Sequence, residues 1–169
     1  MKPNSTVLLV ENNPDDARLA ELAFERARLP HSLMVVADAI EARNYLKGKG
    51  RYSDRNRFPF PKLILLDLGL HGVSGFEFLE EMRQDDDLKT LPVTVLSGSD
   101  YLRDVTKAYQ LGANSFLVKP SQLGKFAAAL KEATEFWLDG MRPTVPCVYL
   151  QTPGQSTPMV GAGNPKSHI

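Results

Sequence analysis

The chain has 169 residues, of which 43% are hydrophobic and 24% charged, as in an ordinary single-domain globular protein. Twenty basic and twenty acidic residues give a formal net charge of zero, so net charge does not indicate a broad nucleic-acid-binding face. The single cysteine, Cys147, excludes an internal disulfide. We expect neither a signal peptide nor a membrane span, because the first residues lead straight into a strand-like run and no apolar run approaches roughly 20 residues. We therefore expect a cytoplasmic protein without a nucleic acid or membrane partner.

Short apolar runs predict five β-strands, each followed by a segment with helical periodicity. The strands are expected at about residues 6–10, 33–37, 62–67, 93–96 and 115–118. The central run, 63–66, has no polar residue, which is typical of a strand buried on both faces of a parallel sheet. Strict alternation of strand and helix predicts an α/β, flavodoxin-like (βα)5 doubly wound parallel sheet with strand order 2-1-3-4-5.

Polar residues mark where four of the helices are expected to begin. Asn13, Asp38, Asp100 and Ser121 are each placed to act as an N-cap. In the second helix, Ile40 is expected to point partly inward. A long basic loop over residues 48–61 precedes the central strand, and it is either a solvated connector or a contact for a partner.

The composition changes near the end of the fifth helix. We expect a folded domain over residues 5–138 and a Pro/Gly-rich tail over 139–169, where nine of 31 residues are proline or glycine. The apolar stretch 145–150 interrupts this composition. The tail is therefore either partly disordered or contains an arm that docks on the domain or on a second copy.

Polar side chains follow the first, third, fourth and fifth strands at the sheet edge where their carboxyl ends meet. They are Glu11 and Asn12, Asp67, Ser97 and Lys119. Asp67 can attack phosphorus and carry the phosphoryl group as an acyl phosphate. Two acidic groups with oxygen neighbours can hold Mg²⁺, and the ammonium and hydroxyl can bind phosphoryl oxygens. The group predicts a phosphoryl-accepting site.

These residues stand in motifs that resemble the response-regulator receiver domain of two-component signalling. The resemblance covers about residues 5–138, through the motifs at 10–14, 65–68, 96–97 and 116–120. It implies that Asp67 accepts phosphate from a histidine kinase, with Lys119 and Ser97 assisting. It also implies a metal site made by Glu11, Asn12, Asp67 and the main-chain carbonyl of Gly69.

The same resemblance implies a switch in which the Ser97 hydroxyl moves to the phosphoryl group and the Phe116 ring turns inward. It further implies a cis Lys119–Pro120 bond. More narrowly, the loop at 48–61, residues 109–114 and residues 135–138 are similar to the stand-alone response regulators of bacterial phytochromes. That group implies a phytochrome-type histidine kinase as partner, a homodimer, and signalling through protein contacts. It implies no enzyme beyond slow autophosphorylation and autodephosphorylation.

Two residues depart from the family pattern. Asn12 stands where a second acid is usual, and a neutral amide compensates less cationic charge than a carboxylate. We expect weaker binding of Mg²⁺ or Mn²⁺ and slower phosphorylation, or, as a rival hypothesis, a scaffold that does not take phosphate. His71 stands where proline is frequent, so the loop after Asp67 is either more mobile or harmlessly altered.

Other function classes are less compatible with the residues present. A phosphatase using aspartyl phosphate needs an acid two residues after its nucleophile, and Gly69 occupies that position. Flavin binding needs a phosphate-cradling loop after the first strand, where Glu11 would repel phosphate. Direct DNA binding needs an output domain, which the tail is too short to supply.

Overall fold

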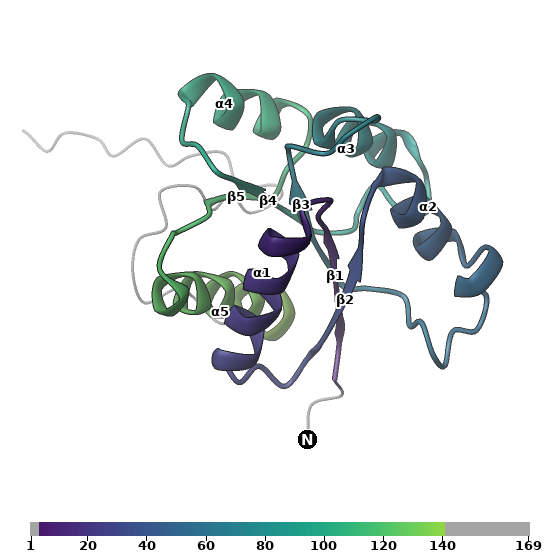
Figure 1. Ribbon diagram of the computed structural model, residues 1–169. Helices are drawn as coiled ribbons and strands as arrows, with labels where there is room; N and C mark the ends of the chain where they lie inside the picture. Colours follow the sequence, from purple (N-terminus) through teal and green to yellow (C-terminus); the bar gives the residue numbers. More distant parts are fainter. Residues whose placement is uncertain (1–3, 141–169) are drawn as a thin grey trace, which may run out of the picture.

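The computed structural model describes residues 4–140, in which strands and α-helices alternate along the chain (Figure 1). The strands are β1 (Thr6–Val10), β2 (Ser32–Val36), β3 (Leu63–Asp67), β4 (Val93–Ser97) and β5 (Ser115–Val118). The helices are α1 (Pro14–Arg26), α2 (Ala39–Lys47), α3 (Gly75–Gln84), α4 (Leu102–Gln110) and α5 (Leu123–Asp139). A short 3-10 helix, η1 (Gly50–Tyr52), follows α2.

The five strands form one parallel sheet in the order β2-β1-β3-β4-β5, which confirms the predicted flavodoxin-like topology. The register aligns the carboxyl ends of the inner strands, because Val10 pairs with Leu66 and Asp67 pairs with Leu96. The residues that follow these strands therefore emerge at one edge of the sheet.

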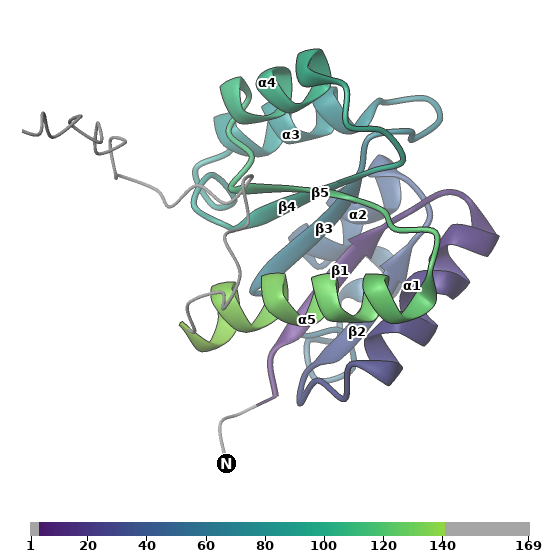
Figure 2. The ribbon, with the colours of Figure 1, turned by 90° about the vertical axis from the view of Figure 1, so that its left-hand side faces the viewer.

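Helices cover both faces of the sheet. Helices α1 and α5 pack side by side on one face, and α2, α3 and α4 cover the other (Figures 1 and 2). Alternate strand residues serve the two layers: Leu65 packs with the α1–α5 layer, whereas Ile64 and Leu66 pack with the other. All five residues of β3 are buried, as its unbroken apolar run predicts.

Two of the four predicted N-caps are confirmed. The Asn13 side chain accepts hydrogen bonds from the main-chain N–H groups of Asp15 and Asp16, and Asp38 accepts one from Glu41. The predictions for Asp100 and Ser121 are wrong, because α4 and α5 begin later, after Tyr101 and Gln122, which make no side-chain cap bond. A shift of one residue takes a short side chain out of reach of the first turn.

The loop between α2 and β3 is more than a solvated connector. Tyr52 is 4% exposed, and its ring packs against those of Tyr45 and Phe58. The Arg55 guanidinium donates hydrogen bonds to the carbonyls of Tyr45 and Leu46, the last turn of α2. The loop thereby closes one end of α2.

Ile40 is 60% exposed, so the prediction that it points partly inward is wrong. The predictions for the tail from residue 141 onward lie outside the described residues. Within residues 4–140, no helix is both long and apolar enough to cross a membrane.

Gly75, the first residue of α3, lets that helix start directly against the end of β3. A Cβ at this position would lie 2.4 Å from the main-chain oxygen of Asp67 and 2.8 Å from the Cα of Leu68. We expect Gly75→Ala to lower the free energy of unfolding by about 2–3 kcal/mol, because main-chain atoms must move. Gly124→Ala is the control: it lies in the first turn of α5 with its nearest contact at 3.8 Å and should be neutral or stabilising. Urea denaturation measures both, and equal midpoints for the two variants would contradict the close approach at Gly75.

Candidate functional site

The residues predicted to form the site come together at the carboxyl edge of the sheet. Asp67 and Ser97 are the last residues of β3 and β4, Glu11 follows β1, and Lys119 follows β5. All of them line one hollow of about 710 Å³, together with Asn12 and Gly69. Phe116 does not line it; this residue of β5 is 1% exposed and lies in the core on the α2–α4 side.

The Lys119 ammonium contacts three carboxylates that line the hollow. Its Nζ lies 2.9 Å from Asp67 Oδ1, 2.7 Å from Glu11 Oε2 and 3.0 Å from Asp16 Oδ2. The Glu11 and Asp67 side chains are 2% and 8% exposed, so neither carboxylate can rely on water for its charge. The Lys119 ammonium therefore connects the ends of β1, β3 and β5 with the first turn of α1.

Burial and hydrogen bonding act on the pKa of Lys119 in opposite directions. Burial lowers this pKa, but hydrogen bonds to Glu11, Asp67 and Asp16 outweigh burial and raise the pKa above its ordinary value. The ammonium is therefore charged at neutral pH. It supplies a fixed positive charge beside the Asp67 carboxylate, where a phosphoryl group would need one.

Ser97 shares the hollow, but its hydroxyl is not bonded to Asp67. The Ser97 side chain is largely buried, and its Oγ accepts a hydrogen bond from the main-chain N–H of Ser99, at 3.2 Å. A hydroxyl in this place can be drawn toward a new group on Asp67 by rotation about one bond. The Phe116 ring is already inside the core.

The donors around Asp67 suit a hard divalent cation. Lys119 bonds Oδ1 of Asp67, while Oδ2 lies on the Gly69 side, where an added Cβ would approach it to 3.1 Å. The three carboxylates bonded to Lys119 outnumber the one ammonium, so this contact set is net negative. Two carboxylates with an amide and a main-chain oxygen form the kind of set that holds Mg²⁺ with several waters.

These candidate ligands include neutral oxygens from an amide and a main-chain carbonyl as well as acidic side chains. Across residues 4–140, no three His, Cys, Asp or Glu side chains are arranged to hold a metal ion. A cation here needs Asn12 and the Gly69 carbonyl as ligands, and that combination is the one the family resemblance implies. The fit therefore depends on neutral oxygen donors as much as on charge.

Of the lining residues that were not predicted to belong to the hollow, Asp16 and His71 contact predicted site residues through their side chains. Asp16 is not among the predicted site residues, yet its carboxylate bonds Lys119. His71 contacts the Asn12 side chain through its Nδ1 atom. The position of Asp16 in the first turn after β1 was a usable signal, whereas the loop path that brings His71 to Asn12 leaves none.

One implied feature is corrected. The described residues contain no cis peptide bond, so the Lys119–Pro120 bond is trans. The trans form is also the intrinsically preferred isomer of an X–Pro bond, by about 0.5–1 kcal/mol.

Comparison with known proteins gives one consistent result. Residues 7–131 match the family model described as the response regulator receiver domain. Response regulator Rcp1 of Synechocystis is 35% identical over 137 residues, covering 81% of this chain and 91% of Rcp1. A solved structure titled as the phosphorylated cyanobacterial phytochrome response regulator RcpA is 35% identical. It superposes with a TM-score of 0.72 over 84% of this chain and 99% of that one. The Mn²⁺-bound form of Rcp1 is 33% identical, with a TM-score of 0.69, over 83% of this chain and 99% of that one.

Removing the Lys119 ammonium should leave two buried carboxylates without a counter-charge. We expect Lys119→Met to lower the free energy of unfolding by about 3 kcal/mol in the absence of divalent cations. Because the folded-state pKa of this lysine is raised, the difference from wild type should be constant up to the ordinary lysine pKa of 10.5 and shrink above it. Chemical denaturation across this pH range measures the difference.

Lys125→Met is the control, since Lys125 is exposed on α5, and it should change stability by less than about 0.5 kcal/mol. If Lys119→Met lowers the free energy of unfolding no more than the control does, the Lys119 ammonium does not stabilise the two buried carboxylates as described.

Proposed function

The chain belongs to the response regulator receiver domain family, and we propose that it is a single-domain response regulator that accepts a phosphoryl group on Asp67 from a histidine kinase. The observation that carries the proposal is the Lys119 ammonium 2.9 Å from Asp67 Oδ1, with Glu11 in the same contact set. A nucleophilic carboxylate beside a fixed cation is the arrangement that acyl-phosphate formation requires.

The transfer proceeds by displacement at phosphorus. A carboxylate oxygen of Asp67 forms a bond to the phosphorus of a phosphohistidine while the P–N bond breaks, and the imidazole leaves with the bonding electrons and takes up a proton from water. The Lys119 ammonium then shifts to donate a hydrogen bond to one phosphoryl oxygen. The Ser97 hydroxyl leaves the Ser99 N–H and donates to another.

A divalent cation, Mg²⁺ or Mn²⁺, would offset phosphoryl charge and orient the group for attack. Glu11, Asn12, Asp67 and the Gly69 carbonyl would hold it. The related Rcp1 has been solved in a Mn²⁺-bound form, which supports a divalent cation as part of the proposal. Because Asn12 contributes a neutral oxygen, we propose weaker cation binding and slower phosphorylation than a carboxylate at this position would give.

The relatives suggest which kinase is involved. The related RcpA is described as a phytochrome response regulator. We therefore propose a bacteriophytochrome-type histidine kinase as the partner of this chain, with both acting in the cytoplasm. The receiver, which we place at residues 5–138, would pass the signal on by protein contacts.

The face formed by α4, β5 and α5 is the proposed route by which the signal leaves. Tyr101, which precedes α4, and Leu102, its first residue, are 65% and 77% exposed, so two neighbouring large side chains offer apolar surface there. Movement of Ser97 toward a phosphoryl group, with repacking around the buried Phe116 ring, would alter this face. We propose that the face, with the tail over 139–169, mediates homodimer or partner contact.

The alternative is a scaffold that works without phosphate. Asn12 favours it, because the cation site has one carboxylate fewer than it could have. The contact between Lys119 and Asp67 opposes it, because a pure scaffold has no need to keep a buried nucleophile beside a partly buried ammonium. A phosphatase remains unsupported, since Gly69 supplies no acid to activate water against the acyl phosphate.

The decisive experiment is to mix the protein with Mg²⁺ and acetyl phosphate and to measure intact mass and the modified peptide. We expect one phosphoryl group, on Asp67. Asp67→Asn should remove the modification altogether, whereas Asp15→Asn, a matched change at an exposed acid just outside the hollow, should leave it unchanged. No incorporation in wild type, from the small donor or from a histidine kinase, would favour the scaffold.

A further inference from the structure

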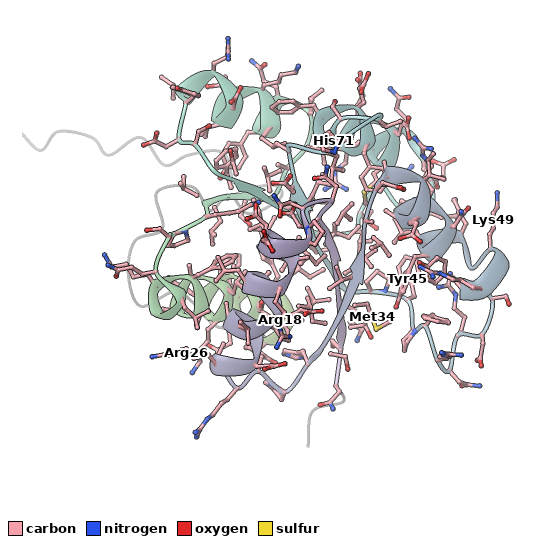
Figure 3. The ribbon with its side chains drawn as sticks, viewed as in Figure 1. Arg18, Arg26, Met34, Tyr45, Lys49 and His71 are labelled. Atoms are coloured by element: carbon pink, nitrogen blue, oxygen red, sulfur yellow. The ribbon has the colours of Figure 1, made fainter. Side chains whose placement is uncertain are left out.

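The Asn12 side chain has one hydrogen-bond partner in residues 4–140, and it is the imidazole of His71. The contact joins Asn12 Nδ2 to His71 Nδ1 across a separation of 59 residues along the chain. Figure 3 shows His71 in the loop between β3 and α3, near the turn that leads from β1 into α1. Both residues line the same hollow as Asp67.

The loop that carries His71 is anchored on both sides. Leu70, the preceding residue, is 7% exposed and belongs to the hydrophobic core on the sheet face covered by α2, α3 and α4. After the loop, Ser74 and Glu77 form a capping box that fixes the start of α3. His71 is thus held over Asn12 by its neighbours, although its own side chain is exposed.

The chemistry of an amide makes this contact consequential. Only the carbonyl end of asparagine can ligate a cation, because the NH₂ end carries two donors and no lone pair for a metal. An imidazole nitrogen that accepts from Nδ2 holds the NH₂ end on the loop side. The carbonyl Oδ1, which no hydrogen bond within the described residues engages, is then left for the hollow.

We propose that His71 is a positioning residue that orients the Asn12 amide so that its carbonyl oxygen faces the cation site. The inference rests on the proposed function, since it concerns the cation that assists phosphorylation of Asp67. A carboxylate at position 12 would have an oxygen at both ends and would need no such orientation. His71 should therefore matter to a cation only while residue 12 is an amide.

A double-mutant cycle on the full chain tests this dependence, with Mg²⁺ affinity measured by titration calorimetry. We expect His71→Ala to weaken Mg²⁺ binding about tenfold in the wild-type background, as loss of a ligand-orienting partner commonly does. In the Asn12→Asp background the same change should cost less than about twofold. Asn12→Asp alone should tighten binding about tenfold through its added charge, whereas Asn13→Asp, a matched change at the neighbouring cap residue, should have a much smaller effect.

His71→Asn is the conservative variant, because its side-chain oxygen can accept from the Asn12 amide, and it should stay within about twofold of wild type. In the metal-free protein, the side-chain amide proton resonances of Asn12 should shift in His71→Ala while the unfolding midpoint does not. Equal losses in both backgrounds, or no loss in wild type, would overturn the inference and leave the proposed function intact. If neither wild type nor Asn12→Asp binds Mg²⁺, the cation site and this inference are both refuted. Whether Asp67 becomes phosphorylated would then decide the proposed function separately.

Discussion

The ion pairs of the Lys119 ammonium are the interaction on which this molecule depends. The Glu11 and Asp67 side chains are 2% and 8% exposed, and leaving either carboxylate there without a counter-charge would be strongly destabilising. Lys119 reaches both of them and Asp16 as well. The same contacts that make the edge of the sheet stable also prepare Asp67 to receive a dianionic group, so the stability of the fold and the chemistry of the site have one source.

The number of carboxylates around Lys119 decides how much negative charge the pocket offers to a divalent cation. The sequence indicated two carboxylates around the reaction centre, because Asn12 replaces the usual second acid. The structure adds a third, Asp16, from the first turn of α1. The net negative charge near Lys119 is therefore larger than the sequence suggested, although Asp16 bonds the ammonium and is not part of the proposed cation ligand set. We infer that the role of Asn12 is set by how its amide is turned, which is a matter of geometry that net charge does not reveal.

The sequence predicted the sheet because its signals are local and strong. An unbroken apolar run such as 63–66 has few alternatives to a buried strand, and alternation with helices leaves one common strand order. The carboxyl ends of parallel strands then bring Glu11, Asp67, Ser97 and Lys119 together without any further information. Caps were harder, because a helix start that differs by a residue removes the role assigned to Asp100 or Ser121. Contacts that depend on a loop path, such as His71 on Asn12 or Arg55 on the end of α2, have no periodic signal at all.

The most direct test of this account is a crystal structure of the chain with Mg²⁺ and beryllofluoride, which mimics a phosphoryl group on a carboxylate. The account predicts beryllofluoride on Asp67, with the Lys119 ammonium and the Ser97 hydroxyl each bonded to a fluorine atom. It also predicts one cation held by Glu11, Asp67, the Asn12 carbonyl and the Gly69 carbonyl. An unmodified Asp67, with Lys119 still bonded only to the three carboxylates and no cation beside Glu11 at saturating Mg²⁺, would contradict it.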